Sequence, residues 1–216
     1  MKKRKLVAIL VLLSFLTTPS MIMAQISGKQ KYQSAKFVYM SSIGYSVGVG
    51  EFKVEGATVK NDVFTISITQ LLAYQFNNYV FSGITAGVDI WKYTAFIPLT
   101  ATVGVTFLDI EAKRVSPFLY LNGGYAFKWY MNTMPESGTK VIKGGNPGIH
   151  LEGGIGARFR MLPKLSAIFM LEYKAQQSTI QYSVIKEGEV DFSRFSTNRT
   201  EKVFYHFPGM KLSFLF

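Results

Sequence analysis

Hydrophobic and polar residues alternate one by one along several stretches of this chain. Between residues 97 and 107, one set of positions reads Ile97, Leu99, Ala101, Val103, Val105 and Phe107, and the set between them holds only Pro, Thr and Gly. The same alternation recurs in residues 64–76, 151–161 and 211–216. Successive side chains of a β-strand point to opposite faces, so a period of two predicts strands with one apolar and one polar face.

Eight such segments follow one another: 37–51, 62–76, 79–91, 96–108, 115–130, 148–162, 165–184 and 202–216. The connections at 77–78, 109–114 and 163–164 are short, whereas those at 131–147 and 185–201 are long and polar. Asn77-Asn78 suits a tight two-residue hairpin because asparagine tolerates positive φ angles. The order predicts one antiparallel, up-and-down domain with short turns at one end and longer loops at the other.

Two architectures use such strands, a soluble sandwich or lipocalin-like barrel and a membrane barrel. The segments are longer than the usual soluble strand, and their polar face carries mostly Gly, Ser and Thr with few charges. The fold class expected is therefore all-β, an eight-stranded antiparallel up-and-down transmembrane β-barrel with a lumen filled by polar side chains and an apolar exterior. Aromatic residues near strand ends are expected to form the interfacial girdle: Trp91, Tyr93, Phe96, Phe127, Trp129 and Phe204.

The first residues have the order of a secretory signal peptide. Residues 2–5 are basic, residues 6–16 are apolar except for one serine, and Ala24 closes the segment. A membrane anchor is the alternative, but the apolar run is shorter than the roughly 20 residues that span a bilayer. We expect a cleaved signal at 1–24, an N-terminal periplasmic segment at 25–36 and the barrel domain at 37–216.

The composition of the chain excludes several classes of protein and of binding partner. The chain has 216 residues, 48% of them hydrophobic, and no cysteine, which excludes a disulfide scaffold, thiolate-bound zinc and iron–sulfur centres. The net charge is +11, but four cations belong to the signal, which leaves 20 Lys+Arg against 13 Asp+Glu, or +7. The basic residues do not cluster into one stripe, so we expect no nucleic-acid partner. No Gly-rich phosphate loop follows a strand and opens a helix, and we expect no cofactor.

The signal ending at Ala24-Gln25, the eight alternating strands, the turn and loop asymmetry and the end Met210–Phe216 together resemble small outer-membrane β-barrels. The chain is similar to the outer-membrane β-barrel domain family common in Bacteroidota, and more distantly to eight-stranded enterobacterial barrels. The resemblance implies a Gram-negative outer membrane, contact with lipid and lipopolysaccharide, and insertion by the barrel-assembly machinery. Leu212, Phe214 and Phe216 resemble the C-terminal signal read by that machinery, although the family's preceding glycine is displaced here to Gly209.

The alternation assigns eight charged side chains to the lumen: Asp89, Lys128, Glu152, Arg158, Arg160, Glu172, Lys174 and Lys211. Isolated charges in a narrow lumen are costly, so these residues are expected to pair and to plug the barrel. A gated channel or a proton path is the alternative interpretation.

Histidines and loops supply the remaining candidate sites. Lipid A deacylases place a His-x-Ser arrangement on the outer barrel wall, but neither His150 nor His206 has serine at that spacing, and only a distant Ser193 is left. Two ligands such as His150 and Glu152 make no metal site. The loops 131–147 and 185–201 are candidate surfaces for a protein partner or for lipopolysaccharide phosphates. We expect a non-enzymatic envelope or interaction protein. The alternatives are an accessory barrel of a secretion or envelope-assembly machine and a lipid A-modifying enzyme.

Overall fold

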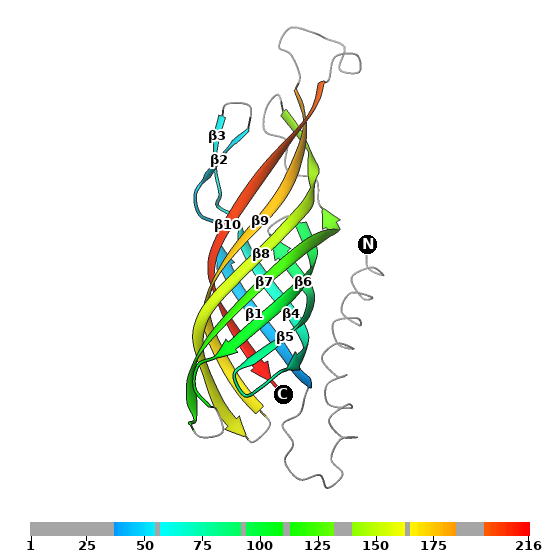
Figure 1. Cartoon of the computed structure of the whole chain (residues 1–216). Helices are drawn as coiled ribbons and strands as arrows, with labels where there is room; N and C mark the ends of the chain where they lie inside the picture. Colours follow the sequence, from blue (N-terminus) through cyan, green and yellow to red (C-terminus); the bar gives the residue numbers. More distant parts are fainter. Residues whose placement is uncertain are drawn as a thin grey trace, which may run out of the picture.

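Eight long strands form a closed antiparallel barrel (Figure 1). They are β1 (Phe37–Val47), β4 (Phe64–Gln75), β5 (Val80–Trp91), β6 (Thr94–Thr106), β7 (Val115–Met131), β8 (Lys140–Leu162), β9 (Leu165–Val184) and β10 (Thr197–Leu215). Each strand pairs with its neighbours in the chain, and β1 pairs with both β4 and β10, which closes the sheet. The predicted fold class and strand number are confirmed.

The computed structural model describes residues 37–54, 57–91, 94–109, 113–131, 140–162, 165–184 and 197–216. The expected signal peptide, the segment 25–36 and Tyr93 lie outside these residues. Within them, no helix is long and apolar enough to cross a membrane.

The β4–β5 connection shows how a short turn is fixed. The Asn77 side-chain oxygen accepts hydrogen bonds from the backbone nitrogens of Tyr79 (2.8 Å) and Val80 (2.9 Å). Phe76 N donates to Val80 O at 3.0 Å, so residues 77–79 form the turn, one more than the two-residue turn expected. We call this end of the barrel, where β4–β5 and β6–β7 are connected, the turn end, and the opposite end the loop end.

A small hairpin, β2 (Glu51–Val54) and β3 (Ala57–Lys60), lies at the loop end, where the sequence predicted only a connection. Gly50 precedes it with a φ of 84°, a conformation that costs glycine little. The Asn61 side-chain nitrogen donates to the carbonyls of Val49 (3.3 Å) and His206 (3.1 Å). Asn61 thereby ties the base of the hairpin to β10.

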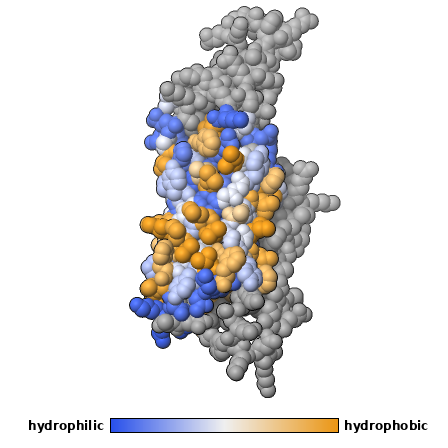
Figure 2. Space-filling model, viewed as in Figure 1, coloured by the Kyte–Doolittle hydropathy of each residue, from blue (hydrophilic) through white to orange (hydrophobic). Residues whose placement is uncertain are grey.

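The barrel exterior is apolar where the strands alternate. Burial along β6 alternates residue by residue, and the exposed set includes Leu99 and Val103. Leu121, Ile155 and Leu171 continue this surface on β7, β8 and β9. Apolar residues cover much of the middle and lower barrel in Figure 2, with hydrophilic residues at the bottom rim and toward the top. An apolar band on the outer surface is the arrangement of a barrel that faces lipid.

Three strands continue beyond the rest of the wall at the loop end (Figure 1). Pairing of β7 with β8 ends at Tyr125–Ile149, whereas β9 pairs with both neighbours as far as Val184. The expected starts of β8 at 148 and β10 at 202 were therefore wrong, since the strands begin at 140 and 197. In these segments, apolar and polar residues do not alternate as they do where a strand lies between lipid and lumen. They are strands because their backbones hydrogen-bond to β9.

Candidate functional site: a lumen closed in three layers

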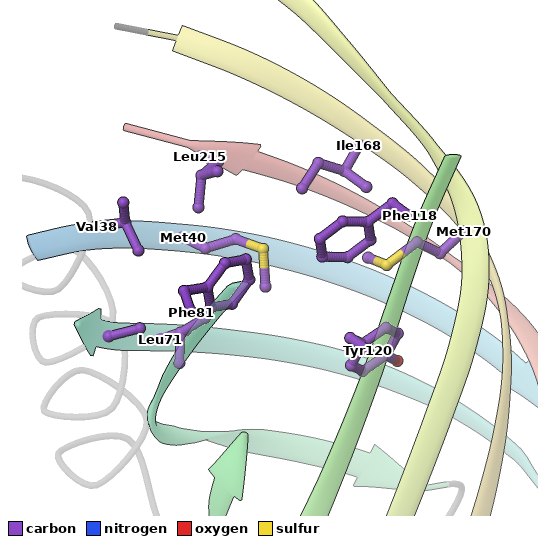
Figure 3. Close-up of a cluster of buried hydrophobic side chains, with 10 residues drawn as sticks. Val38, Met40, Leu71, Phe81, Phe118, Tyr120, Ile168, Met170 and Leu215 are labelled. Atoms are coloured by element: carbon purple, nitrogen blue, oxygen red, sulfur yellow. The ribbon is translucent and has the colours of Figure 1, made fainter. Parts of the chain in front are cut away.

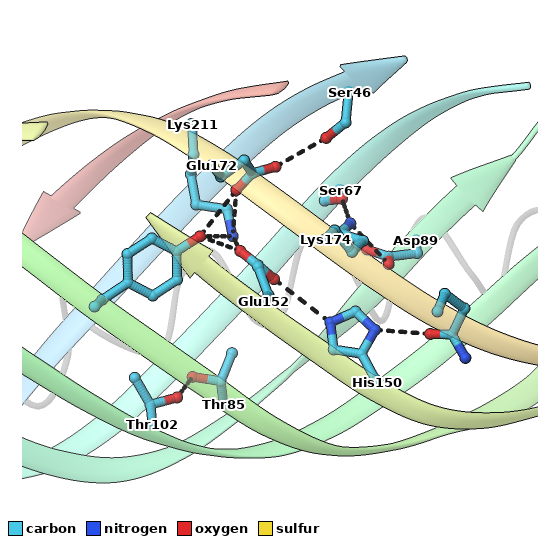
Figure 4. A network of polar contacts seen from close by, with 12 residues as sticks. Ser46, Ser67, Thr85, Asp89, Thr102, His150, Glu152, Glu172, Lys174 and Lys211 are labelled. Carbon is cyan, nitrogen blue, oxygen red and sulfur yellow. Dashed lines mark hydrogen bonds and ion pairs between the residues drawn. The ribbon is translucent and has the colours of Figure 1, made fainter. Parts of the chain in front are cut away.

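The middle of the lumen holds a layer of charged side chains centred on Lys211. The Lys211 ammonium contacts the carboxylates of Glu152 and Glu172, the latter at 2.9 Å, and its Nζ lies 3.2 Å from the Tyr120 hydroxyl (Figure 4). The hydroxyl of Tyr120 also contacts both carboxylates, with Glu172 at 3.0 Å. Ser46 donates to the other Glu172 oxygen at 2.9 Å. Two carboxylates from β8 and β9 are thus held by one ammonium from β10.

A second ion pair of the charged layer joins β9 to the opposite wall. Lys174 is fully buried, and its ammonium lies 2.9 Å from Asp89 Oδ2 and 2.6 Å from the Ser67 hydroxyl. Asp89 comes from β5 and Ser67 from β4, so the long lysine side chain spans the lumen. Charge-assisted hydrogen bonds of this kind are stronger than neutral ones and fix the two walls relative to each other.

His150 extends the charged layer toward β9. The Gln176 amide nitrogen donates to the Gln177 carbonyl at 2.7 Å, which turns its oxygen toward the imidazole. His150 Nδ1 therefore donates to Gln176 Oε1 at 2.8 Å, and its Nε2 faces a Glu152 oxygen at 3.5 Å. Among the described residues, no cluster of three His, Cys, Asp or Glu side chains has the arrangement of a metal site.

An apolar cluster, the inner cluster, closes the lumen on the turn-end side of the charged layer (Figure 3). Its members are Val38, Met40, Leu71, Ala73, Phe81, Phe118, Tyr120, Ile168, Met170 and Leu215. The Phe81 and Phe118 rings stack with centroids 6.0 Å apart. Glycines make room for the rings: Gly104 lies against Phe81, and Gly154 lies against Tyr120. The lumen is thus filled by hydrocarbon as well as by polar groups.

A second apolar cluster, the outer cluster, closes the lumen on the loop-end side. It consists of Trp91, Phe96, Ala126, Val203, Tyr205 and Phe207, with Val63 packed against it. Trp91 makes edge-to-face contacts with Phe96 and Phe207, with ring centroids 4.7 and 4.9 Å apart. Such aromatic pairs stabilise beyond their buried area. The charged layer therefore lies between two apolar layers.

The chain is similar to solved structures of outer-membrane proteins. The outer-membrane protein OprG of Pseudomonas aeruginosa is 9% identical, with a TM-score of 0.51 over 83% of this chain and 96% of that one. The outer-membrane protein AlkL is 12% identical, with a TM-score of 0.40 over 88% and 97% of the two chains. The chain has the fold of a Gram-negative outer-membrane β-barrel. No protein-family model matches the chain, and no curated protein matches it in sequence.

In this barrel, five of the eight charged residues predicted for the lumen lie together in the charged layer: Asp89, Glu152, Glu172, Lys174 and Lys211. Arg158 lies half-buried near the turn end, where its Nη1 donates to Thr106 Oγ1 at 3.4 Å. Arg160 is the next half-buried inward position toward that end. These two arginines therefore do not pair with Glu152 or Glu172.

Lys128 is exposed, which contradicts its assignment to the lumen. It lies beyond the last β7–β8 pair, and the register of β6 with β7 shifts beside it, where Ala95 pairs with Tyr130 and Phe96 with Lys128. Among the described residues β7 and β8 are no longer paired at this level, so the sheet does not enclose the lysine and it is exposed.

The predicted aromatic girdle is wrong at two positions. Trp91 and Phe96 are only 7% and 2% exposed and belong to the outer cluster, because Trp91 shares the inward face of β5 with Asp89 and Phe96 pairs with Asp89. Phe127, Trp129 and Phe204 are exposed on the outside. The inward position of Trp91 could have been predicted from Asp89, because residues two positions apart on a strand face the same side.

The two tryptophans provide a test of this arrangement. A Trp91→Phe variant retains only Trp129, and Trp129→Phe retains only Trp91. In vesicles of brominated lipid, we expect fluorescence of Trp129 to be quenched several-fold more strongly than that of Trp91, because Trp129 is 45% exposed on the surface whereas Trp91 is only 7% exposed. Equal quenching of both would contradict the inward position of Trp91.

The sequence interpretation missed the neutral partners of the charged layer. Tyr120, Ser46 and Ser67 are buried on the inward faces of β7, β1 and β4. His150 also lies in this buried layer, beside Glu152. Extending the period-two pattern to polar and aromatic residues of each strand would have identified all four.

The remaining predicted positions lie on the outer wall. His206 accepts or donates a hydrogen bond with the Tyr173 hydroxyl at 2.8 Å, and the two rings stack. Ser193 is outside the described residues. Leu212 and Phe214 point outward on β10, where the strand closes the barrel against β1, and Phe216, directly after the strand, is exposed as well.

Proposed function

We propose that this chain is a non-enzymatic integral protein of the Gram-negative outer membrane whose lumen is closed and whose loop end presents a surface to the exterior. The observation that carries the proposal is the three-layer filling of the lumen. Transport through the barrel would require the inner cluster, the charged layer and the outer cluster to rearrange together. The strands that project at the loop end, β8 to β10, then form the most prominent accessible part of the barrel.

Planar-bilayer recording tests the closed lumen. The purified barrel is expected to give at most rare, small openings, in contrast to the steady current of a porin measured in the same bilayers. A Phe81→Ala/Phe118→Ala variant removes the stacked pair of the inner cluster but leaves the charged layer, so its current should stay near the baseline. A large, stable, ion-selective conductance from the unmutated protein would replace this proposal by that of a channel.

The outer surface of the barrel supports further proposals about the molecules that it contacts. We propose that the apolar band contacts outer-membrane lipid, that lipopolysaccharide lies against the loop end, and that the barrel-assembly machinery reads the outward residues Leu212, Phe214 and Phe216. Membership of the Bacteroidota barrel family belongs to the same proposal, and the short-turn and long-loop order supports it. The loops around 131–147 and 185–201 are the proposed positions for a protein partner.

A second candidate is an accessory barrel of a secretion or envelope-assembly machine. The sheet of β8, β9 and β10 extends beyond the rest of the barrel wall, and this favours an accessory role. A projecting sheet offers a partner protein a surface to bind, but it contributes nothing to transport through the lumen. Deletion of the gene followed by analysis of secreted proteins separates the two candidates, since only the accessory role predicts an altered set. The lipid A-modifying alternative predicts that His206→Ala changes the mass spectrum of lipid A, whereas the non-enzymatic proposal predicts identical spectra.

A further inference from the structure

Several buried side-chain atoms of the described residues have no hydrogen-bond partner. They are Asn61 Oδ1, Thr65 Oγ1, Asp89 Oδ1, Trp91 Nε1, Asn122 Oδ1 and Arg158 Nε. Buried polar atoms are normally paired with protein groups or with ordered water, because an unpaired one loses its hydration without compensation. A group of unpaired atoms at neighbouring positions therefore indicates a place where something small binds.

Three of these atoms belong to neighbouring inward positions of β4 and β5. Thr65 is the direct cross-strand partner of Trp91, and Asp89 precedes Trp91 by two residues on the same face. Directly opposed residues of an antiparallel pair have Cα atoms about 4.5–5.5 Å apart. The three side chains are each more than nine-tenths buried, at 0% (Thr65), 2% (Asp89) and 7% (Trp91) exposure. They mark the boundary between the charged layer and the outer cluster.

The chemistry of the three atoms is complementary. An indole N–H only donates, an ionised carboxylate oxygen only accepts, and a hydroxyl does both. Asp89 uses its other oxygen for Lys174, at the right of the network in Figure 4. A molecule that accepts from Trp91, donates to Asp89 and bonds Thr65 in either direction satisfies all three. A metal cation does not, because the indole N–H would point at it.

We propose that Thr65, Trp91 and Asp89 bind one buried water molecule inside the barrel. Buried waters typically make two to four hydrogen bonds to protein groups, and three are offered here. The rings of Phe96 and Phe207 pack edge-to-face on Trp91 and are themselves fully buried, so the indole is closely surrounded by aromatic side chains. The water joins the outer cluster to the Asp89–Lys174 pair and completes the hydrogen bonding of the carboxylate.

Nuclear magnetic resonance of the full-length, nitrogen-15-labelled barrel in nanodiscs tests the site. The protein has two tryptophans, so the Trp129→Phe variant assigns the Trp91 indole proton. We expect that proton to show a nuclear Overhauser cross-peak to water with the sign of a long-lived bound molecule. Absence of this cross-peak in the folded protein would overturn the proposal.

Two variants test whether the cross-peak comes from a bound water molecule or from the Thr65 hydroxyl proton, which exchanges with water. In Thr65→Val, two polar partners remain, so the cross-peak should persist while the Trp91 indole resonance shifts. Loss of the cross-peak in this variant would show that it came from the Thr65 hydroxyl and would overturn the proposal. Thr69→Val removes a hydroxyl from the same inward face of β4, four residues away, and is expected to leave the Trp91 signals unchanged.

Discussion

A Lys211→Met variant is expected to unfold far more readily than the unmutated barrel. The substitution leaves the carboxylates of Glu152 and Glu172 facing each other around the Tyr120 hydroxyl without their shared cation. Removing one partner of a buried ion pair costs about 3–5 kcal/mol, which corresponds to more than a hundredfold change in the unfolding equilibrium. Urea unfolding in detergent, followed by tryptophan fluorescence and by heat-modifiable gel migration, measures this loss.

Two further variants identify the cause of that loss. Lys128→Met removes a lysine that is exposed, so its unfolding midpoint should stay close to that of the unmutated protein. Adding Glu152→Gln to Lys211→Met removes one of the two repelling carboxylates and is expected to restore part of the stability. A double variant as unstable as the single one would show that packing of the lysine chain, and not its charge, is what matters.

Ile155→Arg is expected to have the second largest effect, through the lipid and not through the lumen. Ile155 points outward from β8 between Leu119 and Leu171, within the apolar band. An arginine at the middle of the bilayer destabilises a barrel by about 2–4 kcal/mol, and the penalty falls to about 0–1 near the interface. Folding into lipid vesicles, with the folded fraction measured against denaturant, gives the value.

The matched control uses the same substitution at the rim. Leu108 follows β6 at the turn end, so Leu108→Arg should cost much less than Ile155→Arg. In detergent micelles, which deform around a charge, the difference between the two variants should shrink. Equal losses for both variants in lipid would contradict the position of Ile155 within the hydrocarbon region.

The fold was predictable from the sequence because lipid and lumen impose opposite demands on alternate residues. Wherever a strand crosses the bilayer, as β6 does with Leu99 and Val103 outside and Thr100 and Thr102 inside, the pattern is unambiguous. Outside the bilayer, nothing requires apolar and polar residues to alternate along a strand. The first residues of β8 and β10 therefore carried no period-two signal, and their strands are held by pairing with β9 that no local pattern reveals.

The sequence predicted which charged residues lie in the charged layer better than it predicted the contacts between them. Inward parity identified Glu152, Glu172 and Lys211, but the role of Tyr120 depends on Gly154, which lies against its ring on the next strand. Such cross-strand complementarity follows from register, which period-two patterns do not specify. Lys128 shows the converse case, in which parity holds but the neighbouring strand no longer encloses the residue.

The projecting end of β9 has a mechanical consequence. The strand that carries Glu172, Lys174 and Gln176 through the lumen continues without a break to Val184, and β8 and β10 are hydrogen-bonded along both of its edges. Interstrand hydrogen bonds of an antiparallel sheet run perpendicular to the strands, so a pull on the tip along β9 loads many of them together in shear. A pull applied at the loop end is thus resisted by the strand that carries the buried charged layer, and the three-stranded tip transmits the force to the core of the barrel as a rigid unit.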